Sequence, residues 1–239
     1  MIFNKRTLPA RPVAAWGAVG AAAVLALSGC ISVPVAPTEP SAVQPPEQSL
    51  SYVQRLKAMP VAQPSEDAIG QTLQQFVTDS RNTACVFTSS RAGHLNQPWE
   101  PNNYTDSANA AAPIIPVVNC QMVNYPPVQE KDRDGNCAGT NIGYLGGTVL
   151  LAPDKASYGG CRAGVTAIEA AFGPRGTVSE ELAELPVLSP GQAMDGQGYR
   201  CGAMDDGVAC ANLAAGVGFF VDAQSYELFA PAATAAPAG

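Results

Sequence analysis

Six cysteines between residues 85 and 210 constrain the fold of this 239-residue chain more than any other sequence feature. In a chain exported to an oxidising compartment, an even number of cysteines is typical of a disulfide framework. Six cysteines allow fifteen pairings, and sequence alone does not choose among them. We favour pairing of neighbours along the chain, although only the last pair has an argument from local geometry. The favoured pairs are Cys85 with Cys120, Cys137 with Cys161, and Cys201 with Cys210.

That geometric argument concerns the stretch 199–229, in which Cys201 and Cys210 flank a turn signal. If Asp205-Asp206 forms a two-residue hairpin loop, the two cysteines lie directly opposite each other, which suits a cross-strand disulfide. If the loop is Asp206-Gly207, they lie diagonally and a bulge is required. Further on, we expect a bend at 216–218, a strand at 219–221, and Asp222 capping one helical turn that leads to Tyr226.

The first residues have the pattern of an export signal. Lys5, Arg6 and Arg11 precede an apolar run from Val13 to Leu27, which is too short for a comfortable transmembrane helix. The run ends in Leu27-Ser28-Gly29-Cys30, which resembles the lipobox of bacterial lipoproteins. The resemblance implies cleavage before Cys30, diacylglycerol modification of its thiol, and an anchored protein on the extracytoplasmic face of the cell membrane. The alternative is a plain secretory leader with a chance cysteine.

The charge balance argues against two classes of partner. The whole chain has 13 basic and 20 acidic residues, and three of the basic ones lie in the leader. The remaining chain is therefore strongly acidic, which disfavours a nucleic-acid partner and a polybasic lipid-binding face. No cofactor or metal site is predicted: there is no Cys-x-x-Cys, His94 is the only histidine, and the acidic loop 132–136 lacks the closing Glu of a calcium loop.

The chain divides by composition into successive segments. Before the first of the six cysteines, we expect a short helix over 50–59 and a longer one over 66–80, where Ile69, Leu73, Phe76 and Val77 form an apolar stripe. The predicted segments are a lipoprotein signal peptide (1–29), the acylated cysteine with a Pro-rich linker (30–48), a helical segment packed on the domain (49–82), a disulfide-bonded β domain (83–230) and a disordered tail (231–239).

From residue 83 onward the apolar runs are short and separated by turn residues, which is typical of β structure. Strands are expected at 84–88, at 114–123 with Pro116 at an edge or bulge, and at 144–151 with a Gly-Gly irregularity; 159–164 is expected to be a turn. A further helix is expected over 179–185. The predicted fold is mainly β, a small antiparallel sandwich or open barrel with an N-terminal helix and three disulfides.

The order of these features resembles a six-cysteine domain of secreted and lipid-anchored actinobacterial proteins. The residues that carry the resemblance are Cys201, the run 206–212, the run 216–219, the closing Tyr226, Leu228 and Phe229, and Asn119-Cys120 with Pro126-Pro127 and Cys137. The resemblance implies a small disulfide-bonded β domain and assigns no catalytic residue. This chain departs from the pattern at Val217, where relatives often have histidine, and at Cys85, which precedes the Ser-rich turn instead of following it.

The sequence contains no convincing catalytic constellation. His94 has no recognisable partner, the even cysteine count leaves no free thiol, and no Gly-x-Ser-x-Gly elbow occurs. Glu180, Glu181 and Glu184 are typical of a helix start and its solvated face, and Asp205 and Asp206 of a turn. We therefore expect a binding or structural protein of the cell envelope, not an enzyme, that contacts an envelope protein or a glycan. The alternative is a hydrolase acting on wall polymer.

Overall fold

The structure is a computed structural model that describes residues 51–62, 74–96, 99, 110–178 and 180–231, without the side chains of 180 and 181. The predicted signal peptide, Cys30, the linker, most of the predicted long loop and nearly all of the tail lie outside these residues. No helix in the described part is long and apolar enough to cross a membrane.

The first of two sheets has seven strands in the order β6-β5-β4-β2-β1-β7, with β3 pairing with β2. Its neighbours are antiparallel except for the short parallel pair β1–β7. The predicted irregularity in β5 is confirmed as a register shift between Leu145 and Val149. Pro116 lies on β4 beyond the end of its pairing with β5, at a local edge where its missing N–H is tolerated. The strands are β1 (Gln75–Thr78), β2 (Thr83–Arg91), β3 (His94–Asn96), β4 (Ile114–Met122), β5 (Gly143–Leu151), β6 (Ala156–Arg162) and β7 (Val187–Leu188).

The second sheet is a five-stranded antiparallel meander in the order β12-β11-β10-β9-β8. Met204 donates its N–H to the carbonyl of Gly207, so Asp205-Asp206 is the hairpin loop between β9 and β10. Cys201 consequently lies opposite Cys210, which is the first of the two arrangements that the sequence left open. The strands are β8 (Ala193–Gly196), β9 (Tyr199–Ala203), β10 (Gly207–Asn212), β11 (Val217–Asp222) and β12 (Tyr226–Phe229).

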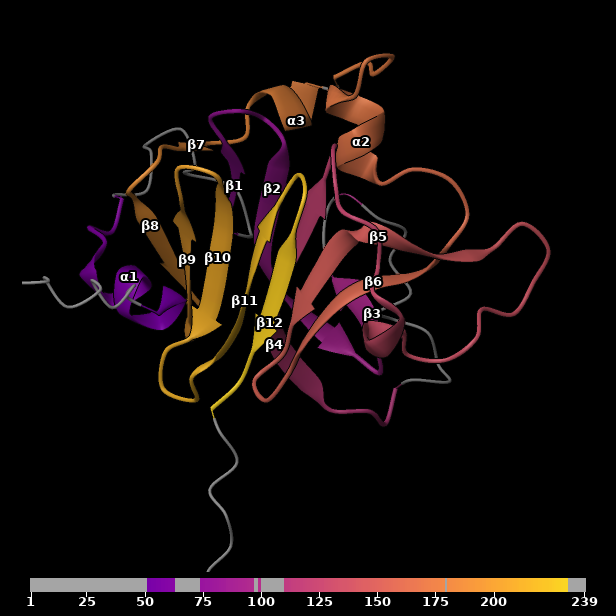
Figure 1. Cartoon of the computed structure of the whole chain (residues 1–239), viewed down its shortest axis with the longest axis horizontal. Helices are drawn as coiled ribbons and strands as arrows, with labels where there is room; N and C mark the ends of the chain where they lie inside the picture. The colour runs from indigo at the N-terminus through magenta and orange to yellow at the C-terminus, as the bar shows by residue number, and fades with distance from the viewer. Residues whose placement is uncertain (1–50, 63–73, 97–98, 100–109, 179, 232–239) are drawn as a thin grey trace, which may run out of the picture. The chain divides into compact units, whose positions relative to one another are not determined.

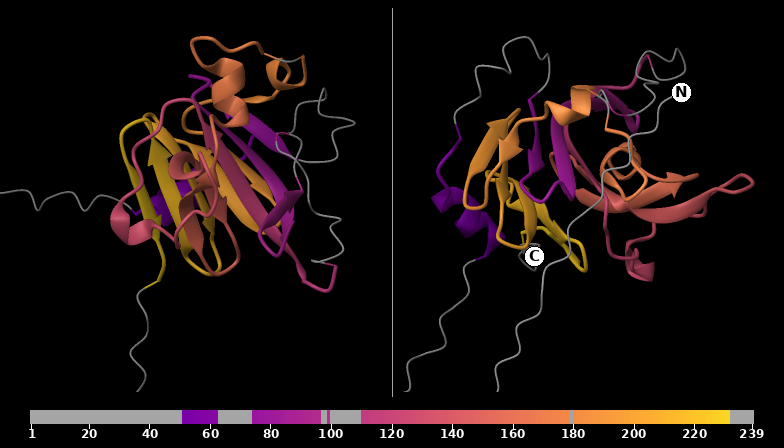
Figure 2. Two further views of the ribbon diagram at one scale, coloured as in Figure 1. Left: turned by 90° about the vertical axis from the view of Figure 1, so that its right-hand side faces the viewer. Right: turned by 90° about the horizontal axis from the view of Figure 1, so that it is seen from above.

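The two sheets pack face to face, which confirms the predicted disulfide-stabilised β-sandwich (Figures 1 and 2). Alternation along each strand sends every second side chain into the space between the sheets. The first sheet contributes Phe76, Phe87 and Val118 to this core, and the second contributes Phe219 and Val221, among others. All five are buried. Each sheet therefore buries the apolar inner face of the other.

Three disulfides follow the predicted pairing: Cys85–Cys120, Cys137–Cys161 and Cys201–Cys210. The first joins β2 to β4 and the last joins β9 to β10, and both lie in the core between the sheets. The sulfurs of Cys85, Cys120 and Cys210 lie within 4.8 Å of one another, so the two core disulfides meet across the sandwich. The remaining disulfide attaches the long β4–β5 connection to β6, near the surface.

The short helix α1 (Tyr52–Ala58) covers the outer face of the second sheet and matches the helix predicted over 50–59. Ser51 and Gln54 form a capping box at its start. Gly202 on β9 leaves room for the helix, because a Cβ there would lie 2.8 Å from Leu56. The ring of Tyr52 stacks on Phe220 with centroids 4.6 Å apart. These contacts fix the point at which the chain enters the domain.

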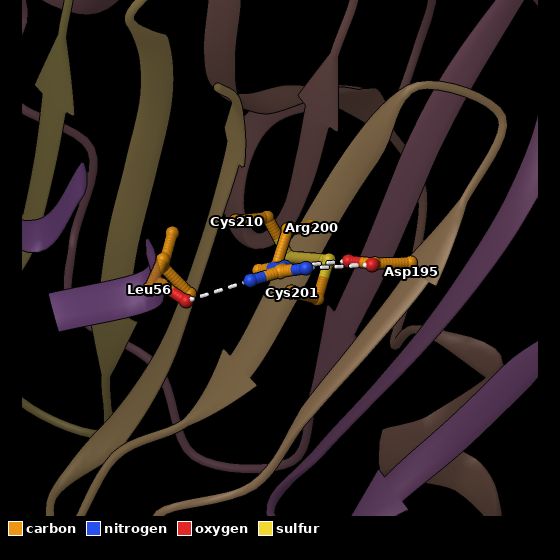
Figure 3. Close-up of polar contacts among 5 residues, drawn as sticks. All are labelled: Leu56, Asp195, Arg200, Cys201 and Cys210. Carbon is orange, nitrogen blue, oxygen red and sulfur yellow. Dashed lines mark hydrogen bonds and ion pairs between the residues drawn. A yellow bond between two sulfur atoms is a disulfide. The ribbon is translucent and has the colours of Figure 1, made fainter. Parts of the chain in front are cut away.

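Arg200 fastens the end of α1 to the sheet (Figure 3). Its neighbour Cys201 points into the core, so the alternation of β9 places Arg200 on the outer face. The guanidinium donates to the Leu56 carbonyl at 3.3 Å and to both carboxylate oxygens of Asp195 at 2.6 and 2.7 Å. The hydrogen bond to Asp195 raises the pKa of Arg200, against the opposing effect of burial.

Two further helices, α2 (Ala167–Phe172) and α3 (Glu180–Ala183), lie next to each other at the top of Figure 1. Ile168 and Leu185 pack against Val77 and Ala84 on the outer face of the first sheet. Thr166 caps α2 and also donates to the carbonyl of Met122 at the end of β4. Both outer faces of the sandwich are thus partly covered by helices.

Part of the predicted helix over 66–80 is wrong, because residues 75–78 form β1. Phe76 faces the core between the sheets, while Val77 faces the α2 side. A strand buried on both faces has consecutive apolar residues, and these imitate one side of a helix. Residues 66–73 lie outside the described part.

Two smaller predictions also fail. Residues 159–162, expected in a turn, continue β6, since the positive φ of Gly159 (80°) is accommodated beside the β5 irregularity. Asp222 caps a β-hairpin turn and not a helical one: its carboxylate accepts hydrogen bonds from the N–H groups of Gln224 and Ser225, both at 2.6 Å. Tyr226 beyond that turn begins β12, because it pairs with Val221.

Candidate functional site

A groove of about 690 Å³ lies on the outer face of the first sheet, over β4, β5 and β6. We call it the sheet-face groove. Its volume falls within the range of roughly 300–1,000 Å³ that is usual for ligand sites. Strand residues form its floor, while β3 and the start of α2 form its walls. The described lining residues are Gly93, Leu95, Trp99, Asn119, Thr148, Leu150, Ser157, Gly159, Gly160, Cys161, Arg162, Ala163, Val165, Thr166, Ala167 and Ala170.

The floor of the groove is a row of three side chains on neighbouring strands. Asn119 on β4 lies opposite Leu150 on β5, and Leu150 lies opposite Ser157 on β6. Val118 and Cys120, on either side of Asn119, point into the core, so alternation along β4 directs Asn119 to the outer face. Asn119 is only 3% exposed, and its Oδ1 has no hydrogen-bond partner among the described residues.

Arg162, at the end of β6, forms part of the groove wall and is held by backbone carbonyls. Its Nη2 donates to the Gly146 carbonyl at 2.6 Å and to the Tyr125 hydroxyl at 3.2 Å, and its Nη1 donates to the Gly164 carbonyl. The guanidinium also lies 5.6 Å from the centre of the Tyr125 ring. Its Nε is buried and has no partner among the described residues.

The β5 irregularity explains why Arg162 is held in this way. Gly147 has a φ of +87°, and a Cβ there would lie 2.6 Å from the Tyr125 ring, so only glycine fits easily. Gly146, next to it, presents its carbonyl to Arg162. The hydroxyl of Tyr125 in turn donates to Glu169 on α2 at 3.0 Å. Arg162 therefore reaches a carboxylate only through Tyr125, and it forms no direct ion pair within the described part of the chain.

Hydrogen bonds from two core tyrosines, Tyr158 and Tyr226, hold the β4–β5 connection that carries Tyr125. Tyr158 donates to the Pro126 carbonyl at 2.6 Å, and its ring stacks on Tyr226 with centroids 3.9 Å apart. Tyr226 donates to Asp132 at 2.5 Å. Burial raises the pKa of Tyr158 to about 12, and burial together with the bond to Asp132 raises the pKa of Tyr226 to about 12. Both hydroxyls are therefore protonated at neutral pH, and the hydrogen bonds that they donate hold the β4–β5 connection against the core.

A comparison with protein-family models, with curated proteins and with solved structures finds no match.

A second cavity, of about 480 Å³, lies where the β1–β2, β9–β10 and β11–β12 turns come together. Asp79, Asp205 and Asp206 line it together with hydroxyl and amide side chains. Asp205 and Asp206 are exposed turn residues, as the sequence indicated. No orphaned buried polar atom belongs to the described lining of this cavity, in contrast to the sheet-face groove.

The structure does not bring the histidine together with a catalytic set. His94 begins β3, opposite Arg91, and is half-buried. In the described part of the chain its imidazole makes no side-chain hydrogen bond or ion pair, and it lines none of the cavities described above. Glu184 is exposed, and the side chains of Glu180 and Glu181 lie outside the described part.

The six cysteines in the described part of the chain all form disulfides. The three sulfurs that lie close enough together to suggest a metal site belong to Cys85, Cys120 and Cys210. All three residues are disulfide-bonded and fully buried, so they offer no thiolate to a metal ion. The proposed lipidation residue, Cys30, lies outside the described part.

Sequence reasoning did not single out Asn119 or Arg162 as functional residues. A polar residue between apolar ones on a strand normally indicates a solvent-facing side chain, so Asn119 gives no sign of being buried. Arg162 follows Cys161 in a glycine-rich run that suggested a turn. The sequence offers one signal, which is that Asn119 directly precedes Cys120. A cysteine whose disulfide lies in the core directs its neighbours on the strand to the opposite face of the sheet.

Proposed function

We propose that this chain is a cell-envelope lipoprotein, anchored through an acylated Cys30, that displays its β-sandwich as a binding module on the extracytoplasmic face of the membrane. The anchoring part is supported by the leader, in which a basic start, an apolar run and Leu27-Ser28-Gly29-Cys30 follow in order. Two or three acyl chains anchor stably where a single chain does not. Three disulfides suit an exported protein.

The observation that carries the binding part is the sheet-face groove. It combines a volume of about 690 Å³ with buried polar atoms of Asn119 and Arg162 that have no hydrogen-bond partner among the described residues. An unpaired buried polar group costs about 1–3 kcal/mol of free energy, which a ligand recovers when it supplies the missing hydrogen bond. The partner would be an envelope glycan or an envelope protein that presents such groups.

The anchoring proposal is tested by replacing Cys30 with Ala in the producing cell and fractionating the membranes after a carbonate wash. We expect the native chain to sediment with membranes and to incorporate a labelled palmitate analogue. The C30A variant should be released or mislocalised without label. Ser41→Ala, in the linker, is the matched control and should behave like the native chain. If C30A stayed in the washed membranes, the lipoprotein proposal would be wrong.

The binding proposal is tested by crosslinking in intact cells, followed by mass spectrometry of captured partners and glycans. We expect adducts that involve residues around the sheet-face groove. The same purified chain is incubated with isolated wall material. Cleavage of that material, with no crosslinked partner, would favour the alternative, a hydrolase acting on wall polymer.

A further inference from the structure

We infer that the sheet-face groove binds a carboxylate-bearing sugar, with Arg162 contacting the carboxylate and Asn119 contacting a hydroxyl group. This inference rests on the proposed binding function and names the ligand class of the same groove. It is carried by three independent features of the described lining: its charge, the complementarity of its two orphaned polar atoms, and its open, glycine-rich surface.

The charge of the groove is opposite to that of the chain. The chain has a formal net charge of −7, but Arg162 is the only charged side chain in the described lining. Glu169 lies behind the Tyr125 hydroxyl and not in the lining. The groove is therefore a local positive site on an acidic protein, which favours an anionic ligand over a neutral or cationic one.

The two orphaned atoms demand different partners. The Nε–H of Arg162 is a donor and needs an acceptor, while Oδ1 of Asn119 is an acceptor and needs a donor. A simple carboxylate supplies acceptors alone, and a neutral sugar supplies hydroxyl groups without charge. A sugar acid supplies both, because it carries a carboxylate and several hydroxyl groups on one small ring. Ser157 and Thr148, both half-buried in the same groove, add hydroxyl groups to the site.

The surface of the groove suits a ring laid flat against it. Gly93 and Gly160 have open space where a Cβ would be, so backbone is directly accessible at both positions. Trp99 and Leu150 provide apolar surface in the lining. Ligand sites commonly combine such apolar surface with a few polar groups that fix the orientation of the ligand. A pyranose ring, with its apolar C–H faces and polar edges, matches this combination.

The test measures binding of digalacturonate, a carboxylate-bearing disaccharide, to the full chain purified in detergent. Cellobiose is the neutral comparison, and inorganic phosphate tests whether any anion suffices. A matched pair of variants, Thr148→Glu and Thr148→Gln, places side chains of nearly equal shape and different charge in the groove. Both variants are first checked for an unchanged far-UV spectrum and three intact disulfides. If T148E fails this check, the pair Ser157→Asp and Ser157→Asn replaces it.

We expect digalacturonate to bind and cellobiose and phosphate to bind at least tenfold more weakly. T148E should bind digalacturonate about tenfold or more weakly than T148Q, because the new carboxylate repels the ligand. In nitrogen-15 spectra, digalacturonate should shift the Nε–H resonance of Arg162. Equal binding by T148E and T148Q, equal binding of phosphate or cellobiose, or an unshifted Arg162 resonance would each overturn the inference.

A failure here is distinguishable from a failure of the proposed function. If digalacturonate does not bind while crosslinking in cells still captures a partner at the groove, the binding module stands and the sugar-acid ligand is wrong. If crosslinking captures nothing and the purified chain cleaves wall material, the proposed function itself is wrong.

Discussion

Removing the three disulfides one at a time should destabilise the domain by amounts set by loop length and burial. The cysteines are separated by 35, 24 and 9 residues in the pairs 85–120, 137–161 and 201–210. In the chain-entropy description, opening loops of these sizes costs about 3.8, 3.4 and 2.6 kcal/mol respectively. Loop length alone thus separates the extremes by about 1.2 kcal/mol.

Burial adds a second contribution to two of the three pairs. Cys85, Cys120, Cys201 and Cys210 are fully buried, whereas Cys161 is exposed. In a Cys→Ala change, the loss of each buried sulfur leaves a gap of about methyl size. Such a gap lowers the free energy of unfolding by about 1 kcal/mol. The expected losses are therefore about 6 kcal/mol for the 85–120 pair, about 5 for 201–210 and about 3.4 for 137–161.

The assay is urea unfolding of the full chain and of the three double Cys→Ala variants, followed by far-UV circular dichroism. The free energy of unfolding is obtained by linear extrapolation. Serine pairs supply the control. Cys137→Ser with Cys161→Ser should match its alanine pair near the surface, whereas Cys85→Ser with Cys120→Ser should be worse than its alanine pair, because two hydroxyl groups are then buried.

Two results would refute this reasoning. Equal losses for all three pairs would show that neither loop length nor burial decides the cost. A loss below about 1 kcal/mol for the near-surface pair would show that loop closure does not stabilise this domain, since that pair has almost no packing contribution.

Three further predictions test other parts of the fold. Leu56→Ala should lower the free energy of unfolding by about 2–5 kcal/mol in urea titrations, because Leu56 is fully buried between α1 and the second sheet, while Lys57→Ala, at an exposed position, should change it by less than about 0.5 kcal/mol. Raising the pH from 10 to 12 should cost about 1.9 kcal/mol at Tyr158, because its pKa of about 12 in the fold exceeds the unfolded value of 10.0 and its stabilisation, about 2.7 kcal/mol in full, is lost as the pH rises toward the folded pKa; urea titrations across this range that stay level would contradict it. Gly147→Ala should lower the thermal midpoint, through its positive φ and its contact with Tyr125, whereas Gly160→Ala should leave it nearly unchanged.

The fold class and the 201–210 disulfide could be predicted because their signals are local, whereas the pairs 85–120 and 137–161 had no local geometric argument. The turn residues between Cys201 and Cys210 predict a hairpin there and leave two possible loops, and the structure has the one, Asp205-Asp206, that places the two cysteines opposite each other. The helix 52–58 was similarly encoded by its cap and one apolar face. In each case residues a few positions apart decide the outcome.

The errors arose where distant packing decides the structure. Phe76 and Val77 are both buried because the second sheet covers one face of β1 and the α2 side covers the other, and no local pattern reports that. Asn119 and Arg162 meet in one groove only through the register of β4, β5 and β6. The sequence accordingly predicts the scaffold and not the site that it carries.

The meeting of the two core disulfides has a consequence for oxidative maturation. With the sulfurs of Cys85, Cys120 and Cys210 within 4.8 Å of one another, docking of the two sheets brings Cys210 near two sulfurs that are not its native partner. Proximity in the finished sandwich therefore does not enforce correct pairing. Correct disulfide pairing therefore has to be reached within each sheet before the sheets dock. At that stage the register of β2 with β4, and of β9 with β10, places only the native partner opposite each cysteine. After docking these cysteines are fully buried, and a thiol isomerase has no access to correct a mistake.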